Sequence, residues 1–142
     1  MRTADPMLPA PAFYSTMVTP YFNRPDWLMS AVGDIVEIAH LAANWNSYGS
    51  PQLTPAAKGQ AVELALKLSH LGLPEPLVAP VSGGGVQFVC SLGPRALELE
   101  VLPDGAIDYL RVYGDDTMKE GRINPALADH LREQVRWLVE HP

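Results

Sequence analysis

Apolar residues recur at helical spacing in two stretches of the first half of the chain. The first stretch begins after Asp26, a residue that caps helices well, and its periodicity continues to about Asn44. The second begins with Thr54 as the cap and Pro55 in the first helical position, and Gly72 provides a stop signal. The apolar faces comprise Leu28, Ala31, Val32, Ile35, Ile38, Ala39 and Ala42 in the first stretch and Ala61, Leu64, Ala65, Leu68 and Leu71 in the second. We therefore predict two consecutive helices.

After Pro74 the apolar period changes from helical to alternating, which is typical of β-strands with one buried face. Alternation is clear in residues 86–90 and 97–101, and residues 107–113 follow a turn as a return strand. Residues 76–81 are expected to add a short edge strand, because prolines are tolerated at the edge of a sheet. The pattern predicts a three- to four-stranded antiparallel meander.

The register of the central hairpin depends on its turn, Pro103-Asp104-Gly105. This sequence favours a type I turn with glycine in a bulge, which pairs Val101 with Ile107. The same register places Glu100 opposite Asp108, an unfavourable pair of like charges, whereas a two-residue turn would avoid it. Turn chemistry is the stronger signal, so we expect the bulged register.

A third helix is expected to begin at Asn124-Pro125 and to run towards the end of the chain. Its inner face would comprise Leu127, Leu131, Val135, Leu138 and Val139. The predicted order is two N-terminal helices, a meander and a C-terminal helix. Such segregation of helices and strands indicates an α+β fold with an antiparallel sheet, in one domain over residues 26–142.

Residues 1–25 differ from the rest of the chain because they contain five prolines, which disfavour a helix or a central strand. They also contain four aromatic residues: Phe13, Tyr14, Tyr21 and Phe22. One interpretation is a passive tail. The other is an extended arm whose aromatic side chains dock on the body or on a partner, since disordered tails are usually poor in aromatics.

Composition narrows the functional classes. The formal net charge is −6 and the isoelectric point is about 5.0, so long-range repulsion disfavours binding to nucleic acid. The apolar stretches are interrupted by charged residues, and the N-terminus lacks the pattern of a secretory signal. A single cysteine, Cys90, excludes an intramolecular disulfide. We expect a cytoplasmic protein without a membrane span.

No motif in the sequence indicates catalysis, a cofactor or a metal. The four histidines lack partners at chelating spacing, and Cys90 is expected on the apolar face of a strand, where a thiol is inert. Glu98 and Glu100 are interpreted as the solvated face of a sheet rather than a glycosidase pair. Ser82-Gly83-Gly84-Gly85 precedes a strand rather than a helix, which argues against a phosphate loop.

The loop Asn44-Trp45-Asn46-Ser47-Tyr48-Gly49 is the strongest candidate for a contact site. Two aromatic residues in a short polar loop are unusual, and two interpretations remain open. Trp45 can fill a gap between the helices and the sheet, or Trp45, Asn46 and Tyr48 can form a recognition loop, because Trp and Tyr supply large contact area at low entropic cost.

This loop, the Thr54-Pro55 helix start, the segment from Pro80 to Phe88 and the Leu97-Glu98-Leu99-Glu100 strand together resemble a group of small uncharacterised bacterial proteins. The group has an Asn-Trp-Asp-x-Tyr/Gly-Gly loop, a helix and a short meander, and the resemblance covers about residues 40–113. Asn46 stands where the group more often has aspartate. The resemblance implies a fold and carries no activity.

The leading hypothesis from the sequence is a non-enzymatic protein-interaction module. Such a module would act as an accessory subunit or an antitoxin- or immunity-like partner, for example in a phage or defence system, or it would form a homo-oligomer. The alternative is a small-molecule-binding protein or a small hydrolase with a pocket between the helices and the sheet, to which Tyr48, Glu98, Glu100 or Cys90 would contribute.

Overall fold

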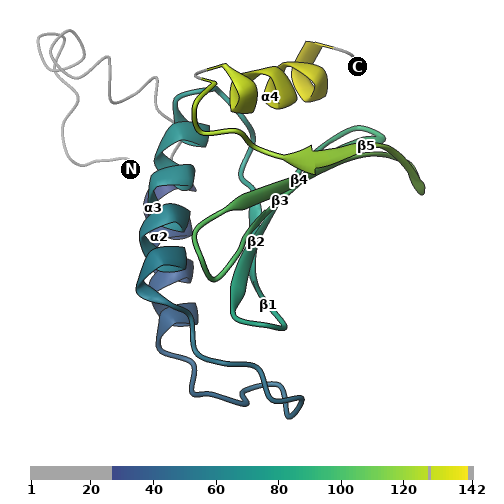
Figure 1. The fold of residues 1–142 in the computed structure, drawn as a ribbon. Helices are drawn as coiled ribbons and strands as arrows, with labels where there is room; N and C mark the ends of the chain where they lie inside the picture. The colour runs from purple at the N-terminus through teal and green to yellow at the C-terminus, as the bar shows by residue number, and fades with distance from the viewer. Residues whose placement is uncertain (1–26, 128, 141–142) are drawn as a thin grey trace, which may run out of the picture.

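The computed structural model describes residues 27–127 and 129–140, which form three helices and one sheet of five strands (Figure 1). The elements in chain order are α2 (Trp27–Ala39), α3 (Pro55–Ser69), β1 (Leu77–Val81), β2 (Gly85–Leu92), β3 (Arg95–Val101), β4 (Ile107–Tyr113), β5 (Asp116–Arg122) and α4 (His130–Glu140). The strands are antiparallel throughout and lie side by side in chain order. The α+β class is therefore confirmed, with five strands in place of the three or four expected. Residues 1–25, the expected arm, lie outside the described residues.

The two long helices form largely where the sequence predicts them. The Thr54 side chain accepts a hydrogen bond from the Ala57 N–H at 3.0 Å, so the expected cap of α3 is confirmed. Helix α2 begins at Trp27 and ends at Ala39, five residues before the predicted end. The reason is a tight last turn: the His40 N–H donates to the Glu37 carbonyl at 3.0 Å, and the chain then leaves the helix axis.

The central hairpin adopts the bulged register, with Val101 opposite Ile107. Glu100 therefore lies opposite Asp108, the like-charge pair that the register implies. Arg122, on β5, lies next to Asp108, and its Nε is 2.7 Å from Asp108 Oδ1. This ion pair offsets part of the repulsion, and the sequence of the hairpin alone contains no sign of it.

Strand β5 is the element that the sequence analysis missed. All seven of its residues are exposed, so it lacks the alternation of apolar and polar positions by which strands are recognised. Its pairing with β4 includes an irregularity between Arg111 and Val112. The polar segment after β4 turns at Gly114-Asp115, and Asp116 already begins the strand.

The core lies between one face of the sheet and the helices, which Figure 1 shows on the same side. Its largest fully buried apolar side chains are Phe88, Ile35, Leu64, Leu68, Leu97, Leu99 and Leu138. The Trp27 indole donates a buried hydrogen bond to the Leu73 carbonyl at 3.0 Å, which joins the start of α2 to the segment that follows α3. The opposite face of the sheet contains Gln87 and Glu98, whose side chains are hydrogen-bonded at 3.0 Å, and no described element covers it.

Helix α4 begins at His130, so the predicted start at Asn124-Pro125 is wrong. The Asn124 side chain accepts a hydrogen bond from the Ala126 N–H at 2.9 Å, which closes a separate turn before the helix. Leu127, expected on the inner face of the helix, is 57% exposed in this turn. None of the helices in the described residues is long and apolar enough to cross a membrane.

Candidate functional site: the loop between α2 and α3

The loop of residues 44–50, here called the Asn44–Ser50 loop, lies at the end of the molecule where α2 ends and β1 turns into β2 (Figure 1). The Asn44 N–H donates to the Ser50 carbonyl at 2.6 Å, which closes the base of the loop. The Asn44 side-chain oxygen accepts from the Gly49 N–H at 2.7 Å. Asn44 and Ser47 adopt left-handed backbone angles, with φ of 63° and 65°. Such angles are uncommon outside glycine, and these hydrogen bonds hold them in place.

A second set of hydrogen bonds attaches the loop to the turn between β1 and β2. The Asn46 side-chain amide donates to Ser82 Oγ at 2.9 Å, and its oxygen accepts from the Tyr48 N–H at 3.0 Å. Ser50 is buried, and its hydroxyl lies 3.2 Å from Ser82 Oγ. The loop is therefore ordered by its own backbone and by the neighbouring turn, with Asn46 as the link between the two.

The two aromatic side chains of the loop lie in different environments. Trp45 is 37% exposed and borders a small gap together with Ile38 and Leu41, so one side of its ring contacts the body. Tyr48 is 87% exposed. Trp45 thus combines the two interpretations that the sequence left open, whereas Tyr48 is presented to solvent.

Charged residues are absent from the segments that build this end of the molecule. No Asp, Glu, Lys or Arg occurs in residues 41–57 or in residues 76–94. Glu100 and Asp104 lie at the margin: a Cβ added at Gly85 would lie 3.9 Å from Glu100 Oε2, and the Thr54 hydroxyl donates at 2.5 Å to the carbonyl of Pro103, which precedes Asp104. Depletion of charge around exposed aromatic residues is typical of the centre of a protein interface. These two uncharged runs are visible in the sequence, and the prediction of a contact loop from its aromatic residues did not include them.

The structure brings three of the seven predicted contact residues together, namely Trp45, Asn46 and Tyr48. The other four, Phe13, Tyr14, Tyr21 and Phe22, lie outside the described residues. Their part in any contact therefore stays a prediction.

The side chains considered for a catalytic pocket do not converge. Cys90 lies in the core with no exposed surface, and burial raises the pKa of its thiol from 9.0 to about 12. Glu98 lies on the opposite, open face of the sheet. Tyr48 is on the Asn44–Ser50 loop. Within the part of the chain that the structure describes, no three His, Cys, Asp or Glu residues are grouped to hold a metal.

Comparison of the chain with protein-family models, with curated proteins and with solved structures finds no match. The resemblance of residues 40–113 to a group of small bacterial proteins therefore stays a prediction.

Proposed function

We propose that the protein is a non-enzymatic interaction module that binds another protein through the Asn44–Ser50 loop and the adjoining β1–β2 turn. The observation that carries this proposal is the combination of a hydrogen-bonded loop with a tyrosine that is 87% exposed at its tip. An ordinary exposed loop contains small polar residues and has no need of six hydrogen bonds to itself and its neighbour.

The energetics of binding favour such a loop. Ordering a flexible loop at an interface costs free energy, and a loop that is already closed by Asn44 and linked by Asn46 avoids most of that cost. A tyrosine side chain has only two side-chain torsions to fix and contributes both apolar area and a hydroxyl. Tyr48 is thus suited to be an anchor residue, with Trp45 beside it.

The partner's chemistry follows from the composition of this surface. Its centre is uncharged, so we expect an apolar pocket on the partner that accepts the Tyr48 ring. The margin carries the carboxylates of Glu100 and Asp104, so basic side chains are expected around that pocket. Two copies of this chain would oppose like charges in the same arrangement, which favours a different protein as the partner. An accessory subunit or an antitoxin- or immunity-like partner fits this description.

Site-specific photocrosslinking tests the proposal. A photoreactive phenylalanine analogue replaces Tyr48 in one variant and Met29 in another; Met29 is 76% exposed on α2 and serves as the matched control. In cells of the source organism, we expect position 48 to form one discrete crosslinked product that position 29 does not form. Identical products from both positions, or none from position 48, would contradict the proposal.

The partner identified by crosslinking is then purified. Its affinity for the wild-type protein and for two variants is measured by calorimetry. We expect Tyr48→Ala to weaken binding at least about tenfold, the loss typical of an anchor residue, and Met29→Ala to leave it unchanged. Equal affinities of the two variants would place the contact elsewhere on the molecule.

A further inference from the structure

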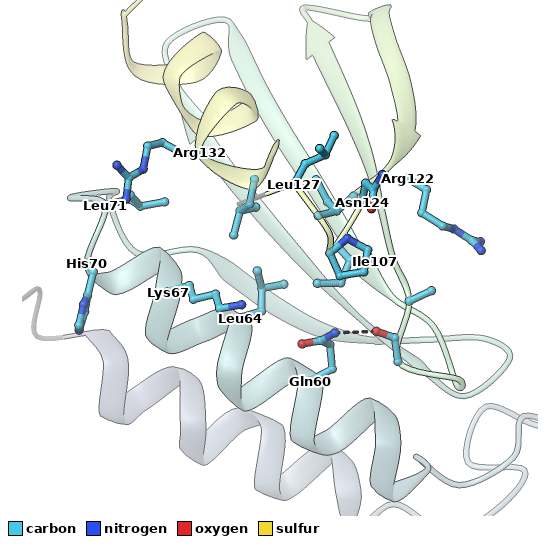
Figure 2. Close-up of a pocket in the computed structure, with 15 residues that line it drawn as sticks. Gln60, Leu64, Lys67, His70, Leu71, Ile107, Arg122, Asn124, Leu127 and Arg132 are labelled. Atoms are coloured by element: carbon cyan, nitrogen blue, oxygen red, sulfur yellow. Dashed lines mark hydrogen bonds between the residues drawn. The ribbon is translucent and has the colours of Figure 1, made fainter. Parts of the chain in front are cut away.

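A cavity of about 490 Å³ lies at the opposite end of α3 from the loop, between this helix, the segment that follows β5 and the start of α4 (Figure 2). Its apolar lining is formed by Leu64, Leu71, Ile107, Ile123, Leu127 and Leu131. Leu64 is fully buried beneath the cavity, and Leu127 is 57% exposed in its wall. A volume of roughly 300–1,000 Å³ with a mainly apolar lining is the usual description of a site for a small organic molecule.

The charged residues around this cavity are all of one sign. Lys67, Arg122 and Arg132 line it together with His70, whereas no Asp or Glu does. The described part of the chain contains eight Lys and Arg residues against fourteen Asp and Glu residues. Three of eight cations and none of fourteen carboxylates therefore line one cavity of an acidic protein, and of the three only Arg122 has an ion pair with a described residue, Asp108. This segregation favours an anionic ligand.

The three cations play different parts. Figure 2 shows the Lys67 side chain extending over the cavity beside Leu64 and Arg132 near Leu71. The Arg122 guanidinium is turned away, because it pairs with Asp108. No ion pair joins Lys67 or Arg132 to another described residue. Among the described cations that line the cavity, these two are therefore the ones we assign to a ligand.

We propose that this cavity binds a small organic molecule with a carboxylate group and an apolar body. The leucine and isoleucine lining takes the apolar body, and the Lys67 ammonium, assisted by Arg132, takes the carboxylate at the mouth. The apolar lining disfavours small inorganic anions, which would lose hydration there without replacement contacts. The inference is independent of the function proposed for the Asn44–Ser50 loop.

Residues 1–26 are the rival occupant. The chain enters α2 at Trp27, which is joined to Leu73 next to the cavity wall at Leu71. The described chain therefore begins close to this cavity, and the aromatic residues at positions 13, 14, 21 and 22 of the sequence are apolar enough to compete with a ligand. The experiment must distinguish the two occupants.

The test is a nuclear magnetic resonance titration of the full-length, isotope-labelled protein with octanoate, 1-octanol and acetate. We expect saturable shifts of the amides of residues 60–71, 105–107 and 122–132 with octanoate. Octanol lacks the charge and acetate lacks the apolar body, so both should bind at least about fivefold more weakly. Raising the salt concentration should weaken octanoate binding and leave octanol unaffected.

Two variants of α3 locate the carboxylate. Lys67→Gln should weaken octanoate binding about fivefold, whereas Lys58→Gln, at an exposed position of the same helix that does not line the cavity, should leave it unchanged. Equal affinities of the two variants, equal affinities for octanoate and octanol, or the absence of saturation would overturn the proposal. Nuclear Overhauser contacts between the Leu127 methyl groups and residues 1–26 in the ligand-free protein would also overturn it, because the chain itself would then fill the cavity.

Discussion

The two ends of α3 present surfaces of opposite character. At its start, near Thr54, the Asn44–Ser50 loop projects from the molecule, carries no charge and is held by hydrogen bonds to its own backbone. At its end, near His70, the surface is hollow, apolar within and basic around the mouth. Projecting aromatic surfaces insert into partners, whereas hollow surfaces enclose small ligands. One small scaffold thus offers two kinds of contact, and shape and charge distinguish them.

The core between the two ends contains the buried thiol of Cys90, which we expect to be chemically inert. The pH dependence of the free energy of unfolding tests this expectation, and its effect is the largest that we predict. Burial raises the pKa of the Cys90 thiol from 9.0 to about 12, so the folded protein keeps a proton that the unfolded chain loses. The free energy of unfolding should therefore fall as the pH rises from 9 to 12, by up to about 1.4 kcal/mol per pH unit from this group.

Urea unfolding of the wild type and of Cys90→Ala between pH 8 and 11 isolates this contribution, because all other groups are common to both proteins. The wild type should lose stability more steeply above pH 9. Parallel curves would mean that burial does not raise the pKa of the Cys90 thiol. Rapid reaction of the native thiol with a chromogenic disulfide at pH 8 would mean that the thiol is accessible and reactive. Either result would contradict an inert core between the two sites.

Gly85 probes how closely the loop end depends on the sheet. An alanine Cβ at this position would lie 2.5 Å from the Val101 carbonyl oxygen, so β2 would have to move away from β3. We expect Gly85→Ala to cost about 2–3 kcal/mol of stability. Gly59→Ala is the matched control, since nothing lies within 4 Å of the added atom in α3, and it should stabilise the protein by about 0.5–1 kcal/mol. Urea midpoints that coincide would contradict the close approach.

Trp45 and Leu127 compare the two ends directly. Trp45 is 37% exposed and contacts the body with one side of its ring, so Trp45→Ala should cost about 2 kcal/mol, which is less than for a fully buried tryptophan. Leu127 is 57% exposed in the cavity wall, and Leu127→Ala should change stability by less than about 0.5 kcal/mol. Thermal unfolding measures both. The reverse order would mean that the cavity wall, rather than the loop, is part of the stabilising core.

Local signals were enough to predict much of the fold. Thr54 and Pro55 define the start of α3 by themselves, and alternation in β2 and β3 places Phe88 and Leu99 in the core. Features that depend on tertiary contacts could not be predicted from the sequence pattern. Strand β5 has no apolar face and forms because β4 supplies its hydrogen-bonding partner and Asp108 pairs with its last residue.

The same distinction applies to the two sites. The Asn44–Ser50 loop is continuous in sequence, so its aromatic residues could be recognised directly. The cavity is assembled from α3, the β3–β4 turn and the chain that follows β5. Lys67 and Arg132 are 65 positions apart, and Asn124 was expected to begin the last helix rather than to close a separate turn. Their juxtaposition depends on the sheet and the placement of α4, which the sequence pattern does not contain.

The most direct test of the central claim is the backbone order of the Asn44–Ser50 loop, measured by ¹⁵N relaxation. The proposed function requires a loop that is ordered before it meets a partner. We predict order parameters of about 0.85 for the amides of residues 46–49, equal to those of α3, and lower values in Asn46→Ala, which loses the links to Ser82 and Tyr48. Values below about 0.6 in the wild type would contradict the account, because Tyr48 would then be an exposed side chain on a flexible loop.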